Sequence, residues 1–173
     1  GRRRFDEAVA SGKPVIILAG HFGNWELSPI VAAIEGYPSV SLARAQNRWP
    51  RLYRLLVSYR ESKGCTIVHK GGSMKRLLAA LDRRQLVGIV GDQASHQGIP
   101  VDFFGRPAFF ATGPFKLAYR KEALLLPFFL YRVQGPYHRL MVEPPIILDD
   151  RLPEEEAVRQ GIERFARMLT HHI

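Results

Sequence analysis

Nearly continuous runs of apolar residues alternate along this chain with segments in which apolar residues recur every three or four positions. The apolar runs cover residues 14–20, 39–44, 65–70 and 86–92. They are rich in valine, isoleucine and leucine and alternate little with polar residues, which is typical of strands covered on both faces of a sheet. The pattern therefore predicts four buried β-strands.

The segments between these runs have the spacing of amphipathic helices. They cover residues 24–36, 49–64 and 73–85. In the second segment, the apolar residues that recur at helical intervals are Leu52, Leu55, Leu56 and Tyr59. A repeated strand–helix order builds βαβ units. We therefore expect a single α/β domain over residues 1–173, with a mostly parallel sheet flanked by helices on both faces.

The pattern changes after the fourth strand. Residues 93–113, QASHQGIPVDFFGRPAFFATG, contain glycine, proline and aromatic residues without a clear period. A stretch of this length without regular structure in a compact domain is usually functional, so we expect a functional loop here. Two further strands are predicted at residues 124–132 and 138–146, and an amphipathic helix near Pro153.

Length and hydrophobicity limit the class of protein. A chain of 173 residues fits one domain with a sizeable core. Its longest nearly unbroken apolar run, residues 123–131, is about half as long as a bilayer-spanning helix requires. Helical patterns stand at both ends of the chain. We therefore expect the natural protein to continue in both directions, with any membrane anchor outside this stretch.

The charge is strongly positive. The formal net charge is +9, and the chain has 19 arginines against 6 lysines. Guanidinium groups suit bidentate binding of phosphate or carboxylate. No nucleic-acid-binding motif accompanies the charge, so we expect no nucleic acid partner. An anionic membrane surface or an acidic soluble partner fits better. The arginines expected to favour an anionic membrane surface are Arg2, Arg3, Arg4, Arg48, Arg51 and Arg54.

The stretch ILAGHFGNWEL, residues 17–27, carries the candidate chemistry. His21 stands at the carboxyl end of the first strand, where open parallel sheets place their ligands, and Glu26 falls in the first turns of the next helix. The carboxylate can fold back, accept a hydrogen bond from Nδ1–H of the histidine and leave Nε2 free as a base. This is the second half of a Ser-His-Asp arrangement.

The attacking hydroxyl has to come from the substrate, because no G-x-S-x-G motif is present. A base that activates a bound alcohol indicates transfer of a group onto that alcohol. A metal site is not expected, because H-E-x-x-H is absent and Cys65 is the single cysteine. Cys65 also excludes an internal disulfide.

The motif GHFGNWEL resembles the H-x4-D/E signature of glycerolipid acyltransferases. Its flanking residues resemble those of the late lipid A acyltransferase branch, which includes the mycobacterial phosphatidylinositol mannoside acyltransferases. The likeness continues in LARAQN, VGIVGDQ and VDFFGRPAFFATG, in the family's order and spacing. It covers roughly residues 10–147. Members of that family also have an N-terminal membrane helix, which we expect to lie outside this stretch of chain.

The resemblance implies a glycerolipid acyltransferase-like fold and an O-acyltransferase. It would move a fatty acyl group from acyl carrier protein or coenzyme A to a hydroxyl of a membrane glycolipid, such as a lipid A precursor, without another cofactor. The reaction would take place at the cytoplasmic face of the bacterial inner membrane. Phosphatidylinositol mannoside and lysophospholipid remain alternative acceptors. A hydrolase and a non-catalytic, peripheral lipid-binding module remain alternative functions.

The resemblance also assigns roles to residues. It makes His21 the general base and Glu26 the carboxylate that orients it. The residues expected to bind substrate are Arg44, Asn47, Arg60, Asp92 and Gln93. The residues that could line an acyl-chain groove, or could instead serve in packing, which the residues alone favour, are Phe103, Phe104, Phe109 and Phe110. Asp92 should lie near His21 if the first and fourth strands are close together in the sheet, which the resemblance suggests.

Overall fold

All four predicted strands form, together with a second group of strands later in the chain. The computed structural model describes residues 1–45, 47–69 and 73–173, with the side chains at positions 73, 96 and 97 left out. Gln46 of LARAQN and Lys70 of the third predicted strand lie outside the described residues. The first four strands are β1 (Val15–Gly23), β2 (Ser39–Ala43), β3 (Cys65–His69) and β4 (Leu86–Val90).

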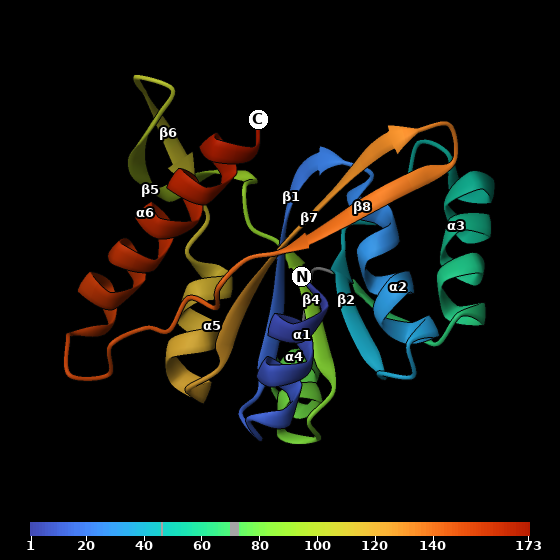
Figure 1. Ribbon diagram of the computed structural model, residues 1–173, viewed down its shortest axis with the longest axis horizontal. Helices are drawn as coiled ribbons and strands as arrows, with labels where there is room; N and C mark the ends of the chain where they lie inside the picture. Colours follow the sequence, from blue (N-terminus) through green and yellow to red (C-terminus); the bar gives the residue numbers. More distant parts are fainter. Residues whose placement is uncertain (46, 70–72) are drawn as a thin grey trace.

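One twisted sheet organises the molecule (Figure 1). Strands β7 (Leu124–Gln134) and β8 (Tyr137–Val142) complete the six-stranded order β3-β2-β4-β1-β7-β8. Every neighbouring pair is parallel except β7 and β8, which run antiparallel. The prediction of a mostly parallel α/β sheet is therefore confirmed, and the first and fourth strands are direct neighbours.

Helices cover both faces of the sheet, as the continuous apolar strands require. The helical segments are α1 (Arg2–Ala10), η1 (Trp25–Leu27), α2 (Ser28–Ile34), α3 (Pro50–Ser62), α4 (Ser73–Asp82), α5 (Gly113–Lys121) and α6 (Glu154–His172). On β1, Ile16 packs into the core under α4, α5 and α6, whereas Ile17 packs into a second cluster with residues of α1 and α2. Among the described helices, none is long and apolar enough to cross a bilayer.

The expected loop at residues 93–113 is instead largely a β-hairpin. Strands β5 (Ala94–Phe103) and β6 (Arg106–Phe110) pair antiparallel and lie beside α6 in Figure 1. Phe103 pairs with Arg106, so Phe104 and Gly105 form a two-residue turn, with φ of 55° and 74°. Positive φ at both central residues is the geometry of a tight hairpin turn. Prolines and glycines interrupt the alternation of apolar and polar residues in these strands, so the sequence pattern did not predict them.

Strand β1 is irregular at its carboxyl end, where the candidate motif lies. Ala19 pairs with Phe128 and Gly23 with Leu130, so four steps along β1 match two along β7. Gly23 has φ of 58°, and a Cβ there would collide with the carbonyl of Leu130. Only glycine fits that conformation so close to another backbone. The resulting bulge takes His21 out of the regular ladder and re-aims its side chain.

Candidate functional site

His21 is held by Asp92. The carboxylate of Asp92 accepts two hydrogen bonds from His21: one from the backbone N–H at 2.6 Å and one from ring Nδ1 at 2.7 Å. The side chain of Asp92 is 15% exposed and that of His21 is 45% exposed. Because a carboxylate only accepts, the ring carries its proton on Nδ1 and presents Nε2 as the basic nitrogen. Among the described residues, none forms a hydrogen bond with Nε2.

Two local features make this contact possible. Asp92 follows β4, which lies beside β1 in the sheet. The carboxylate at the end of β4 is therefore close to His21 at the end of β1. Gly20 leaves room for it, because a Cβ at this position would lie 3.3 Å from Oδ2 of Asp92. Trp25 packs edge-on against the imidazole, with ring centroids 4.9 Å apart, and limits the orientations that the ring can adopt.

Glu26 has a different partner from the one that the sequence predicted. It lies in η1, close to His21 along the chain, but its carboxylate pairs with Nη2 of Arg60 on α3. The predicted hydrogen bond between Glu26 and His21 is therefore wrong in this structure. The physical reason is that a buried guanidinium, 7% exposed, requires a counter-ion and takes the nearest carboxylate.

A second polar pair stands beside the Arg60–Glu26 pair. The hydroxyl of Tyr53 lies 3.1 Å from Nδ1 of His69, at the end of β3. Burial raises the pKa of the Tyr53 phenol; the Arg60 charge opposes this shift and the Glu26 charge adds to it. Tyr53 therefore stays neutral at physiological pH and can donate or accept a hydrogen bond.

Five of the candidate residues line one cavity of about 490 Å³. It opens at the carboxyl ends of β1, β2 and β4, and more apolar than polar surface lines it. The side chains of interest on its wall are His21, Trp25, Glu26, Ser28, Ser39, Ser41, Arg44, Tyr53, Leu56, Arg60 and Gln93. Two buried polar atoms on this wall, Oγ of Ser28 and Nε of Arg60, have no hydrogen-bond partner among the described residues. The cavity thus offers apolar space and unsatisfied polar groups together, as ligand sites do.

The structure brings most of the predicted site residues together. Arg44, Arg60 and Gln93 line the cavity with His21 and Glu26, whereas Asn47 is exposed and does not line it. Asp92 contacts His21 and is absent from the cavity wall.

The four phenylalanines expected to form an acyl groove do not line the cavity. Phe110 is buried in the core and Phe103 packs against it, while Phe104 and Phe109 are exposed on the hairpin. They follow the hairpin away from the sheet edge, so the expectation that they border the pocket of His21 is wrong for this structure.

Some residues of the cavity escaped the sequence analysis. Ser39 and Ser41 are polar positions two residues apart on a buried strand, and both face the cavity. That period-two polarity was the available signal, because side chains two apart share a face of a strand. Tyr53 carried no such signal, since only the packing of α3 against β3 places it there.

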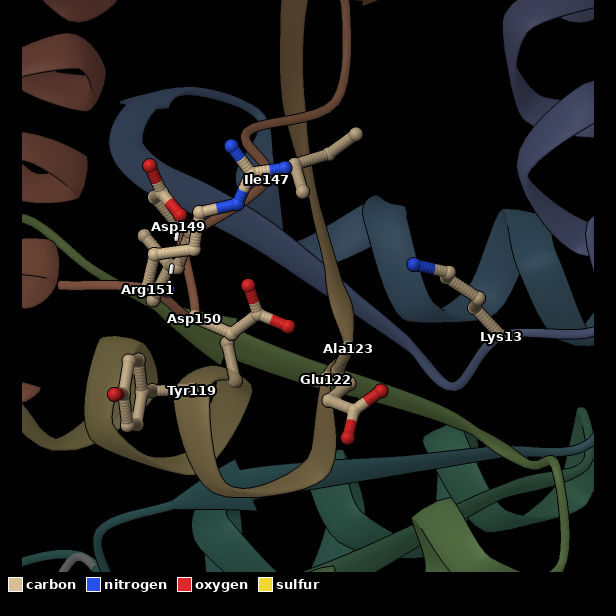
Figure 2. Close-up of a pocket in the computed structure, with 10 residues that line it drawn as sticks. Lys13, Tyr119, Glu122, Ala123, Ile147, Asp149, Asp150 and Arg151 are labelled. Carbon is tan, nitrogen blue, oxygen red and sulfur yellow. Dashed lines mark hydrogen bonds between the residues drawn. The ribbon is translucent and has the colours of Figure 1, made fainter.

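A second cavity, of about 420 Å³, lies near the amino ends of β1 and β7 (Figure 2). Lys13 stands on one side of it, and Glu122 and Asp150 extend from the other side toward the same space. Among the side chains that the structure describes, no histidine or cysteine lines it. Open parallel sheets use the opposite edge for ligands, so we take the cavity of His21 as the candidate site.

Comparison with known proteins shows the family of the chain. The sequence profile of the family described as "Bacterial lipid A biosynthesis acyltransferase" matches residues 1–173. The chain is 26% identical over 178 residues to the phosphatidylinositol mannoside acyltransferase of Mycobacterium tuberculosis, covering 99% of this chain and 55% of that protein. It is 25% identical over 170 residues to a lipid A biosynthesis acyltransferase of Haemophilus influenzae, covering 95% of this chain and 53% of that protein.

A third relative is the phosphatidylinositol mannoside acyltransferase of Mycolicibacterium smegmatis, 27% identical over 165 residues, with 92% of this chain and 53% of that protein covered. The chain thus spans about half the length of the curated relatives that it matches.

Proposed function

Because the chain belongs to the bacterial lipid A biosynthesis acyltransferase family, we propose that it transfers a fatty acyl group from a thioester to a hydroxyl of a membrane glycolipid. The observation that carries the proposal is the histidine at the mouth of the cavity. Asp92 fixes Nδ1 of His21, and no described residue bonds to Nε2, which lies beside a mainly apolar cavity large enough for part of a lipid.

The proposed reaction needs one base and no covalent enzyme intermediate. Nε2 of His21 takes the proton from the acceptor hydroxyl as that oxygen attacks the carbonyl carbon of the thioester. The tetrahedral intermediate collapses, the carbon–sulfur bond breaks, and the imidazolium returns the proton to the thiolate. Asp92 keeps the ring in the correct tautomer and stabilises the imidazolium while it exists. The reaction thus yields an ester and a free thiol, without a metal or a further cofactor.

The developing oxyanion needs positive charge or hydrogen-bond donors. The backbone N–H of His21 already donates to Asp92, and that of Asn24 donates to Leu130. We propose a cationic side chain of the cavity, Arg44 or Arg60, for this role. The same guanidinium groups suit the phosphates of an anionic donor or acceptor.

The donor and the acceptor follow from chemistry and from the relatives. Acyl carrier protein and coenzyme A are both acidic, and the charge of +9 favours either. The names of the relatives support a lipid A precursor or a phosphatidylinositol mannoside as acceptor. We place the reaction at the cytoplasmic face of the bacterial inner membrane, because the relative from Haemophilus influenzae is named for lipid A biosynthesis.

The test is an assay of the purified protein with a fatty acyl thioester, carried by coenzyme A or by acyl carrier protein. Acceptors are a lipid A precursor, a phosphatidylinositol mannoside and a lysophospholipid, and mass spectrometry identifies the product. We expect thiol release together with a new ester on a glycolipid, and loss of both in His21→Ala. Thiol release matched by free fatty acid with every acceptor would establish a hydrolase instead. Lipid binding without thiol release would establish a non-catalytic module.

A further inference from the structure

The outer face of α3 is apolar and uncovered. The spacing of Leu52, Leu55, Leu56 and Tyr59 predicted a helix, and the helix forms, but these side chains do not enter the core. Leu52 is 65% exposed, Leu55 66% and Tyr59 50%. Trp49, directly before the helix, is 63% exposed. Scattered exposed apolar residues are ordinary, but a contiguous group on one helix face indicates a binding surface.

The inner face of α3 already packs against the protein without these residues. Tyr53 contacts His69 of β3, and the buried Arg60 pairs with Glu26. The packing of α3 on the sheet therefore leaves apolar side chains of this helix uncovered. We call the exposed part, formed by Trp49, Leu52, Leu55, Leu56 and Tyr59, the outer face of α3.

Cations border this outer face. The guanidinium of Arg48 lies over the ring of Trp49 and the ammonium of Lys63 lies over the ring of Tyr59, each 5.9 Å from the ring centroid. Arg51 lies one turn before Leu55 and is exposed. Among the described residues, none of these three cations forms an ion pair.

The arginines of α1 differ in this respect. Arg2 pairs with Asp6 and Glu35, and Arg3 pairs with Glu7. Carboxylates thus offset the charge on α1 and leave the charge beside α3 available. An apolar helix face bordered by free cations matches an anionic lipid surface, in which acyl chains lie beneath negative headgroups.

The outer face also continues into the cavity of His21. Leu56 is 37% exposed and lines the cavity, and Tyr53 and Arg60 of the same helix line it as well. A lipid that leaves a bilayer along α3 would pass from Leu52 and Leu55 to Leu56 on the cavity wall. Catalytic cavity and lipid surface are therefore joined by one helix.

We infer that α3 lies in the interface of an anionic membrane and that the lipid acceptor enters the cavity of His21 along it. The apolar side chains of the outer face sit among the acyl chains, and Arg48, Arg51 and Lys63 contact headgroup phosphates. The entry route rests on the proposed function, whereas the membrane contact stands without it.

Flotation with vesicles tests the membrane contact. We compare vesicles of phosphatidylcholine with equimolar mixtures of phosphatidylcholine and phosphatidylglycerol, at low and high salt. The protein should bind the anionic vesicles more tightly, and salt should weaken this binding. Leu55→Gln should weaken binding about tenfold or more, because an apolar side chain no longer leaves water. Arg51→Gln should weaken it about fivefold on anionic vesicles alone.

Matched controls stand at the opposite edge of the sheet, beside the second cavity. Ile147 is 58% exposed and Arg151 is also exposed. Ile147→Gln and Arg151→Gln should bind vesicles as the unchanged protein does. The inference is wrong if these controls lose as much binding as the α3 variants, or if neutral and anionic vesicles bind equally at low salt.

A second measurement reports position directly. In a Trp25→Phe protein, the remaining tryptophan is Trp49. Lipids brominated on the acyl chains should quench its fluorescence on anionic vesicles, and absence of quenching in the vesicle-bound protein would overturn the placement of α3. Shielding of Trp49 from a water-soluble quencher without vesicles would indicate a dimer formed through the outer face. That result would also overturn the placement of α3 in the membrane.

Activity assays separate this inference from the proposed function. Leu55→Gln should transfer acyl groups normally to a short-chain, water-soluble acceptor and poorly to an acceptor embedded in vesicles. If it loses both reactions equally, the entry route is wrong. If the unchanged protein transfers no acyl group to either acceptor while vesicle binding still follows the outer face, the proposed function is wrong and the membrane contact stands.

Discussion

The carboxylate of Asp92 accepts hydrogen bonds from both the backbone and the ring of His21, although the two residues are 71 positions apart along the chain. This double contact exists because β4 and β1 are parallel neighbours whose carboxyl ends meet at one edge. In the proposed mechanism, Asp92 is therefore the residue that orients His21. It leaves Glu26 to neutralise Arg60.

The first prediction concerns Asp92. Asp92→Asn should lower turnover about 10²–10⁴-fold, because an amide can hold the ring in the wrong tautomer and cannot stabilise the imidazolium. KM for the donor should change little, since Asp92 does not line the cavity. Steady-state kinetics with a defined thioester measures both quantities, and circular dichroism checks the fold. Wild-type turnover in Asp92→Asn would remove Asp92 from the proposed mechanism.

The second prediction concerns the pair of Glu26 and Arg60. Glu26→Gln leaves a guanidinium that is 7% exposed without its counter-ion. The free energy of unfolding should fall by about 1–3 kcal/mol, the typical cost of an unsatisfied buried polar group. Denaturant unfolding measures it, and Glu61→Gln, an exposed change on α3 next to Arg60, is the control.

A double-variant cycle sharpens this prediction. Replacing both partners, with Glu26→Leu and Arg60→Met, should cost less stability than the sum of the single changes, because no unpaired charge remains. Additive losses would mean that the two side chains do not interact in solution.

The third prediction concerns the apolar space in the cavity. Ser41 is buried on β2 and faces the cavity, so Ser41→Leu places an isobutyl group inside it. If the cavity holds the acyl chain, kcat/KM should fall about tenfold or more for a long-chain thioester and less for a short one. Thr66→Leu adds similar volume at an exposed position of β3 and should change neither value. Equal losses for long and short donors would place the acyl chain elsewhere.

The fourth prediction concerns the bulge that carries His21. Gly23→Ala combines positive φ with a collision between Cβ and the carbonyl of Leu130. Gly36→Ala is the matched control, because Gly36 also has positive φ, 86°, but open space around it. Both should lose about 1–2 kcal/mol for the left-handed backbone. Gly23→Ala should lose about 1–3 kcal/mol more for the overpacking, measured by denaturant unfolding.

Local patterns in the sequence were sufficient for the elements of the sheet. Continuous apolar runs located β1, β2, β3 and β4, because a strand buried on both faces has to be apolar at every position. Strand–helix alternation was sufficient for the parallel sheet, since crossovers connect parallel strands. The position of His21 at a strand end also followed from the sequence, as it depends only on where an apolar run stops.

Pairings between distant segments were decided by the tertiary structure alone. Spacing along the chain favoured Glu26 as the partner of His21, but the strand order brought Asp92 to the ring and the packing of α3 brought Arg60 to Glu26. The sequence was insufficient for α3 in the same way. Its periodic leucines predicted a helix, but they did not show that the rest of the chain leaves one face of it uncovered. Periodicity records which side chains share a face, whereas burial and pairing depend on what the rest of the chain places against that face.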